Sequence, residues 1–132
     1  MDTSAWYATE VEDDTNHSPA MEFIKKLVTN RYGLLVTSDY VLDETLTLIR
    51  KRRGSRAAIQ FLDKIKKTQS LSIAWIERDV FDKATEIFRT ADEKQVWSFT
   101  DCTSFSIMKE LGIANAYTFD SDFQNAGFHV LP

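Results

Sequence analysis

Four acidic residues of this chain stand where carboxylates could gather at one place. Asp2 precedes a helical segment of small residues, Asp101 lies at the start of a predicted helix, and Asp120 directly follows a predicted strand. Glu44 lies at the edge of the apolar stripe of its helix. An acidic residue at a helix start is usually a cap or a partner of the helix dipole. The four together are more informative, because converging carboxylates repel one another and raise each other's pKa unless a cation neutralises them.

The available ligand types predict a hard metal ion at such a site. The chain has one cysteine, Cys102, which we interpret as a small core residue. It has two histidines: His17, interpreted as solvated, and His129, to which we assign no role. We therefore expect no disulfide and no cysteine-based zinc site. Oxygen ligands alone favour Mg²⁺ or Mn²⁺. Such sites serve phosphoryl chemistry, in which the metal activates water and neutralises phosphate charge.

The elements that must position these carboxylates alternate between helices and short apolar strands. Hydrophobic periodicity predicts helices over residues 19–28, 39–49, 55–65, 80–91 and 101–111, and the expected caps are Ser18, Ser38 or Asp39, Ser55 and Thr100. Apolar runs predict strands over 34–36, 71–75, 117–119 and 129–131. This order predicts a layered α/β fold with a mainly parallel sheet. Ligands of such sheets bind beyond the carboxyl ends of the strands.

Length and composition limit the classes of function that fit. The chain of 132 residues predicts one domain over 1–132, and its 43% apolar residues can form a normal core. A net charge of -4 excludes nucleic-acid binding by overall positive charge, so such binding needs a local basic patch or bound cations. No apolar run reaches the length of a membrane span, and no signal peptide is visible. We therefore expect a soluble cytoplasmic protein without membrane contact.

Four segments resemble, in order and spacing, the acidic motifs of the PIN-domain family. They are MDTSAW at 1–6, TSDYVLDET at 37–45, SFTDC at 98–102 and TFDSDF at 118–123. Each motif alone is weak, whereas four in register across essentially the whole chain are a much stronger signal. Within the family, the chain is most similar to single-domain VapC-type toxins of prokaryotic toxin–antitoxin systems.

The resemblance implies a three-layer α/β/α fold and a Mg²⁺- or Mn²⁺-dependent endoribonuclease, the toxin component of a type II toxin–antitoxin system. Cleavage of the RNA phosphodiester would leave a 3′-hydroxyl and a 5′-phosphate. The implied partners are an RNA substrate, a small VapB-like antitoxin that lies over the active cleft, and a second copy in a homodimer. The implied residues are Asp2, Glu44, Asp101 and Asp120 as catalytic metal ligands, Asp122 as a fifth candidate ligand, and Thr3 and Thr100 as hydroxyls that orient the ligands.

The sequence departs from the family pattern before its first aspartate. The family places an apolar strand there, whereas only Met1 precedes Asp2 in this chain. Either the natural start lies upstream or the central strand is truncated. An α-amino group on Met1, with a reference pKa of about 8, would oppose cation binding at the neighbouring Asp2.

Basic residues are concentrated in one segment. Residues 50–67 hold eight of the sixteen lysines and arginines and a single acid, Asp63. The segment begins shortly after Glu44, so it is a plausible footprint for the RNA backbone. A solvated helical face, or a surface that pairs with an acidic antitoxin, explains the same pattern. The candidate RNA-binding residues are Arg50, Lys51, Arg52, Arg53 and Arg56.

Two other classes of function compete with the nuclease. A PIN-like module that binds RNA or a partner without cleaving it fits the same motifs with a damaged first one, and metal titration would separate the two. A phosphoacceptor receiver domain has a similar length and α/β layout. Receivers need a lysine after a late strand, but none follows Lys109, and the predicted strand near 71–76 ends without an aspartate. We therefore discount the receiver.

Overall fold

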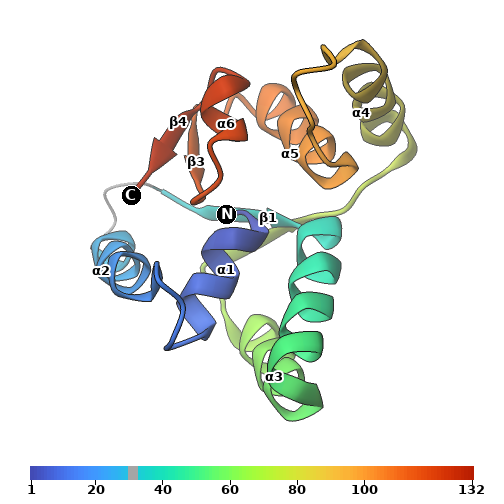
Figure 1. The fold of residues 1–132 in the computed structure, drawn as a ribbon. Coiled ribbons are helices and arrows are strands. Elements are labelled where there is room, and N and C mark those ends of the chain that lie inside the picture. Colours follow the sequence, from blue (N-terminus) through green and yellow to red (C-terminus); the bar gives the residue numbers. More distant parts are fainter. Residues whose placement is uncertain (30–32) are drawn as a thin grey trace.

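The computed structural model describes residues 1–29 and 33–132 and places helices on both sides of short strands. Figure 1 shows α1, α2 and α3 on one side of the strands and α4, α5 and α6 on the other, which is the expected α/β/α layering. In chain order the elements are α1 (Thr3–Glu10), α2 (His17–Val28), β1 (Leu35–Ser38), α3 (Asp39–Lys67), β2 (Leu71–Ala74), α4 (Arg78–Thr90), α5 (Phe99–Glu110), β3 (Asn115–Tyr117), α6 (Asp122–Asn125) and β4 (His129–Leu131). Among these helices, none is both long and apolar enough to span a bilayer.

The four described strands form two parallel pairs. β1 pairs with β2, and β3 pairs with β4. Parallel pairing with helical connections confirms the predicted α/β class. The predicted strand 129–131 is confirmed as β4, whereas the strand predicted over 117–119 lies at 115–117. The amide of Thr118 still donates to the carbonyl oxygen of Leu131 at 3.0 Å, but the next residue after β4 is Pro132, which has no amide hydrogen to continue the pairing.

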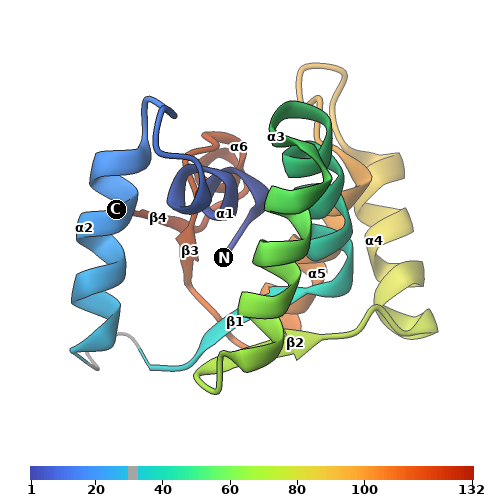
Figure 2. The same ribbon diagram turned by 90° about the horizontal axis from the view of Figure 1, so that it is seen from below.

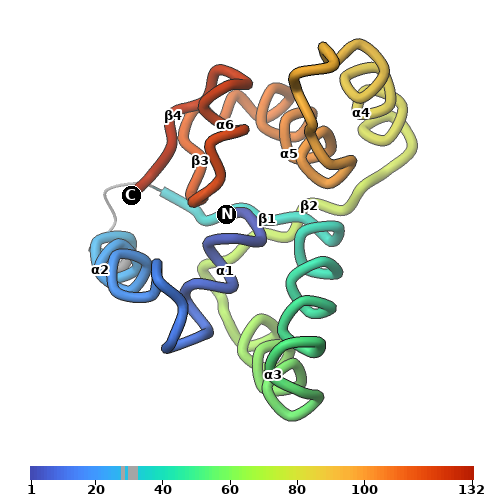
Figure 3. Tube along the Cα trace, in the orientation of Figure 1, coloured from blue at the N-terminus to red at the C-terminus, as the bar shows by residue number. Residues whose placement is uncertain are grey.

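The first two residues join the two pairs of strands. The α-amino group of Met1 donates to the carbonyl oxygen of Val36 in β1 at 2.7 Å. The amide of Asp2 donates to the carbonyl oxygen of Tyr117 in β3 at 3.0 Å. Figures 2 and 3 show the amino terminus between β1 and β3. A largely apolar cavity of about 400 Å³ adjoins Met1 in this gap, with Leu35 and Met108 among its lining residues.

The element α3 consists of two helical segments that meet at a kink at Gly54, as the sequence predicted. Ser38 begins it as expected, since its Oγ accepts the amide of Val41 at 3.2 Å. Gly54 has φ 86° and ψ 171°, a backbone conformation that residues with a Cβ atom rarely adopt. The predicted break at Gly54 is therefore confirmed, whereas the capping role predicted for Ser55 stays a prediction.

Two predicted helix caps are each wrong by two residues. α2 is preceded by Asn16 rather than capped by Ser18, because the amide of Ala20 already donates to the carbonyl of Asn16. α5 is capped by Ser98 rather than Thr100, because Ser98 Oγ accepts the amide of Asp101. The second correction matters for function, since it makes Asp101 part of a capping box.

The core consists of three apolar clusters with α1 between two of them. Trp6 packs edge-on against Phe61 of α3, with ring centroids 5.5 Å apart. The opposite side of α1 contributes Ala5 and Ala8 to a cluster with α2 and β3. The third cluster centres on Phe105 of α5 and packs it against α6 and β4. Since α1 is packed on both sides, Asp2 at its amino end is held firmly in place.

Candidate active site

Asp101 is one of two buried acids of the site, with 9% of its surface exposed against 7% for Asp2. Its Oδ2 accepts two hydrogen bonds from Ser98, one from the amide at 2.8 Å and one from the hydroxyl at 2.7 Å. Burial raises the pKa of Asp101 to about 6, against the lowering effect of these two bonds, and the charges of Asp2 and Asp120 raise it further. The helix cap therefore fixes Oδ2 of Asp101. Ionising this carboxylate costs free energy, because it is buried and lies near Asp2 and Asp120.

Asp120 and Asp122 complete a cluster of three acids with Asp101. The amide of Asp122 donates to Oδ1 of Asp120 at 2.9 Å, which folds the turn between β3 and α6 back on itself. One carboxylate oxygen from each of the three residues lies within 4.8 Å of the others. The sequence predicted Asp122 only as a fifth candidate, yet the structure places it directly beside the other two.

Asp2 adjoins this cluster through shared hydroxyl groups. Its Oδ2 accepts the Ser4 amide at 3.1 Å, the Ser4 hydroxyl at 3.0 Å and the Thr118 hydroxyl at 3.1 Å. The Thr118 hydroxyl also accepts the Asp120 amide at 3.0 Å, so it connects the two acids. Asp2 Oδ1 has no hydrogen bond to any described residue and is available to a ligand.

Ser4 and Thr118 are residues of the candidate site that the sequence prediction did not name. Ser4 lies two positions after Asp2, and Thr118 lies two positions before Asp120. A hydroxyl two residues from an aspartate commonly bonds within the same turn. That spacing was the available signal, but their mutual contact at 3.1 Å joins residues 114 apart in the chain. The sequence alone does not show such a contact.

Glu44 lies at the rim of the site rather than within the acidic cluster. It is exposed, and its Oε2 accepts the Thr3 hydroxyl at 2.7 Å. The predicted contact between Thr3 and an acid of the site is thus present, whereas ligation by Glu44 and Asp2 stays a prediction. Glu44 and Thr100 line a cleft of about 330 Å³ together with Tyr40. No hydrogen bond joins the Thr100 hydroxyl to a carboxylate in the described part of the chain, so its orienting role also stays a prediction.

The α-amino group of Met1 opposes a cation less than its reference pKa suggested. Burial lowers its pKa to about 6, although the charge of Asp2 raises it. Most of the group is therefore uncharged at neutral pH. It donates to Val36 and occupies a place in the gap between strands, beside Asp2.

The donor set suits a hard cation. The clustered side chains offer carboxylate oxygens only. Cys102, next to Asp101, is fully buried, and burial raises the pKa of its thiol to about 11. A thiol with that pKa does not ionise at neutral pH and is a poor ligand. The Nδ1 atom of His17 is bonded to the carbonyl oxygen of Ala8, away from the acids. Oxygen ligands without nitrogen or sulfur match Mg²⁺ or Mn²⁺.

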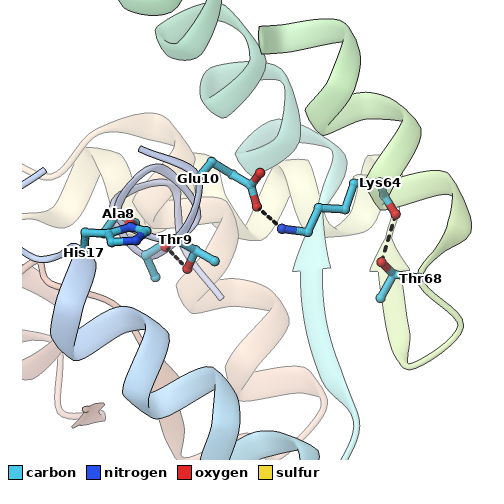
Figure 4. A network of polar contacts seen from close by, with 7 residues as sticks. Ala8, Thr9, Glu10, His17, Lys64 and Thr68 are labelled. Atoms are coloured by element: carbon cyan, nitrogen blue, oxygen red, sulfur yellow. Dashed lines mark hydrogen bonds and ion pairs between the residues drawn. The ribbon is translucent and has the colours of Figure 1, made fainter. Parts of the chain in front are cut away.

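The five candidate RNA-binding cations fall into two groups in the structure. Arg53 forms an ion pair with Asp13, and the Arg52 guanidinium lies 5.5 Å from the centre of the Tyr7 ring. The remaining three are exposed without an ion pair to any described residue: Arg50, Lys51 and Arg56. Further along α3, Lys64 is paired with Glu10, as Figure 4 shows. The end of α1 and the following loop thus neutralise part of the basic segment.

Comparison with known proteins decides the family. The sequence model of the PIN domain matches residues 1–129. The chain belongs to the PIN-domain family. The match covers nearly the whole chain and includes all four acidic motifs.

Named relatives of this PIN domain are VapC proteins. It is 38% identical over 128 residues to the "23S rRNA-specific endonuclease VapC20" of Mycobacterium tuberculosis, which covers 97% of this chain and 93% of that protein. It is 27% identical over 123 residues to the "VapC ribonuclease" of Archaeoglobus fulgidus, with 93% of this chain and 77% of that protein covered. The crystal structure of M. tuberculosis VapC20, described as a Sarcin-Ricin loop cleaving toxin, superposes with a TM-score of 0.86 at 36% identity, over 99% of this chain and 97% of that one.

Proposed function

We propose that this PIN-domain protein is a Mg²⁺- or Mn²⁺-dependent endoribonuclease and the toxin component of a type II toxin–antitoxin system. The observation that carries the proposal is the convergence of Asp101, Asp120 and Asp122 within 4.8 Å at the carboxyl side of β3. Carboxylates that converge in this way repel one another when they are ionised, and a bound cation relieves that repulsion. The naming of its relatives as endonuclease and ribonuclease supports RNA as the substrate.

The proposed roles follow from the contacts of each residue. Asp101, Asp120 and Asp122 would hold the cation, with Asp2 Oδ1 and Glu44 as further ligands. When bound, Mg²⁺ or Mn²⁺ supplies charge neutralisation at the phosphate and activation of water. Ser98 fixes the orientation of Asp101, and the hydroxyls of Ser4 and Thr118 fix Asp2. These hydrogen bonds hold Oδ2 of Asp101 and Oδ2 of Asp2 and leave Oδ1 of each to bind a cation. The two acids are therefore oriented before the substrate binds.

The first substrate to test is the sarcin–ricin loop of 23S rRNA, because the relatives that share 38% identity are named for that rRNA. The exposed cations Arg50, Lys51 and Arg56 would contact the RNA backbone. A VapB-like antitoxin is the proposed inhibitor, and a homodimer, acting in the cytoplasm, is the proposed assembly. Trp75, with 66% of its surface exposed, is a candidate residue of the interface between copies.

The test is a cleavage assay with the purified protein. A synthetic sarcin–ricin stem-loop and a scrambled RNA of the same length are incubated with Mn²⁺, with Mg²⁺ or with EDTA. We expect cleavage only with metal, with 3′-hydroxyl and 5′-phosphate ends. The variant Asp120→Asn should lose activity, whereas Asp63→Asn, an exposed acid of α3, should keep it. Cleavage that persists in EDTA, or in Asp120→Asn, would contradict the metal-dependent mechanism.

A catalytically impaired binding module is the second candidate. The observation that favours it is the exposed position of Glu44, which lies outside the cluster of three acids and accepts the hydroxyl of Thr3 instead. Isothermal titration with Mn²⁺ distinguishes the two. The nuclease predicts binding that Asp101→Asn abolishes, whereas the impaired module predicts RNA binding without metal binding.

A further inference from the structure

The first turns of α3 and α5 form the cleft of about 330 Å³ beside the acidic cluster. Its lining residues are Asp39, Tyr40, Asp43, Glu44 and Thr100. Ser38, which ends β1, caps α3, so Tyr40 lies at the carboxyl end of a parallel strand, where ligands of such folds bind. Asp39 Oδ1 accepts the amide of Ile76 at 3.0 Å, which fixes the start of α3 against the chain after β2.

The charge of this cleft selects one part of an RNA chain. Three of its five lining residues carry carboxylates, and none carries a cation. These carboxylates would therefore repel a phosphate group of the RNA from this cleft when no cation is bound there. A nucleobase is uncharged and presents a flat face, which stacks on an aromatic ring. The Tyr40 ring is the only aromatic surface among the lining residues, and its hydroxyl has no hydrogen bond to a described residue.

Tyr40 belongs to a row of neighbouring aromatic rings. The centroid of the Phe99 ring lies 6.3 Å from that of Tyr40. Phe81 and Phe88 of α4 also pack against Phe99, with ring centroids 5.0 and 5.8 Å from its own. Both nevertheless keep 42% and 51% of their surface exposed. The row therefore begins at the cleft and continues as exposed aromatic surface along α4, which Figure 1 shows beside α5.

We propose that Tyr40 is a substrate-binding residue that stacks on the base next to the scissile phosphate, and that the rings of α4 extend the platform to the following base. The inference rests on the proposed function, because it takes RNA as the substrate. It adds a base-recognition element to a site otherwise built of carboxylates. Continuity with the acidic cluster favours RNA over a protein partner, since Thr100 of the cleft directly precedes Asp101.

The test couples a protein change to an RNA change. The matched variants are Tyr40→Phe, which keeps the ring, and Tyr40→Leu, which keeps apolar volume without a ring. Each is assayed by kcat/KM on the cleaved RNA and on copies with one abasic nucleotide at each position around the cut. Stacking on one base is worth between about 5-fold and about 150-fold. We expect Tyr40→Leu to lose activity in this range and Tyr40→Phe to stay within about 2-fold of the parent.

The abasic scan also works on the parent protein alone, should Tyr40→Leu fail to fold. A single abasic position next to the cut should reduce kcat/KM of the parent, and the same position should have little further effect in Tyr40→Leu. A parent indifferent to every abasic substitution would overturn the inference. Additive losses when Tyr40→Leu is assayed on the abasic RNA would also overturn it. A changed molecular mass of Tyr40→Leu in light scattering would do so too, because it would assign the row of rings to an interface between copies.

Binding measured in EDTA separates this inference from the proposed function. Fluorescence anisotropy of labelled RNA reports binding without cleavage. A parent that binds RNA through Tyr40 but never cleaves it would refute the nuclease and support the stacking role. A Tyr40→Leu variant that cleaves RNA as well as the parent would refute the stacking role alone. A parent that neither binds nor cleaves RNA would refute both.

Discussion

Replacing Asp101 with asparagine should stabilise the metal-free protein above about pH 6 and remove its response to divalent cations. The pKa of Asp101 is raised from an ordinary value of 3.8 to about 6, chiefly by burial. As pH rises from 4 to 6, the unfolded chain releases this proton first, so the free energy of unfolding falls. The penalty is complete above about pH 6 and absent below about pH 4. Asparagine carries no charge at any of these values.

The magnitude follows from the size of the rise. A rise of about two in the pKa of Asp101 corresponds to about 3 kcal/mol of free energy. Water in the adjoining cleft screens part of this penalty, which leaves about 1–2 kcal/mol. Asparagine Oδ1 can still accept the bonds from Ser98, so the helix cap is retained. For 132 residues, an unfolding entropy of about 2.1 cal/mol/K per residue converts this gain into about 4–7 °C in Tm.

The assay is thermal unfolding at pH 4.5 and pH 7.5, in EDTA and in Mn²⁺. In EDTA, Asp101→Asn should melt above the parent at pH 7.5 and close to it at pH 4.5. With Mn²⁺ at about 100 times its Kd, the parent should gain about 2.7 kcal/mol and overtake the variant. Asp63→Asn is the matched control, because it makes the same chemical change at an exposed acid of α3.

Two results would refute this reasoning. Equal melting of Asp101→Asn and the parent at pH 7.5 in EDTA would show that the carboxylate pays no penalty for ionising. Equal stabilisation of both proteins by Mn²⁺ would show that the ion binds elsewhere in the molecule.

The remaining predictions concern α3. Neutralising Arg50 and Arg56 should make the slope of log RNA affinity against log salt shallower by about 0.7 per lost single-strand phosphate contact. Neutralising Arg53, which is paired with Asp13, should change the slope less. Equal slopes in all variants by salt titration would exclude a contact between these cations and the RNA backbone. Gly54→Ala should destabilise the protein by about 1–3 kcal/mol, because φ 86° and ψ 171° suit only glycine; denaturant unfolding beside a Ser55→Ala control measures this, and a change equal to the control's would place the kink elsewhere.

Much of the site was predictable because its parts are local. Asp101 lies three residues after Ser98, a spacing that defines a capping box, although our prediction placed the cap at Thr100 instead. Ser38 and Gly54 did predict the start and the kink of α3 from the sequence alone. The acidic motifs gave the family, which the later comparisons confirmed.

The features that escaped prediction depend on contacts between distant residues. The hydroxyls of Ser4 and Thr118 meet only once β3 lies beside the amino terminus. Asp122 joins Asp120 because the turn before α6 folds back, and a four-residue helix leaves almost no periodic signal. Glu44 is exposed although it borders the apolar stripe of its helix, and hydrophobic periodicity does not show which edge positions a neighbouring element covers.

The position of Met1 has a practical consequence for any laboratory that handles the protein. An affinity tag fused to its amino group would have to run through the cavity between β1 and β3, or else pull Met1 away from Val36. Either path strains the bond between Asp2 and Tyr117 and so disturbs an acid of the site. Pro132 is exposed at the other end of the chain. Tags and fluorophores therefore belong at the carboxyl terminus, and a metal affinity measured on an amino-terminal fusion would report the fusion as much as the protein.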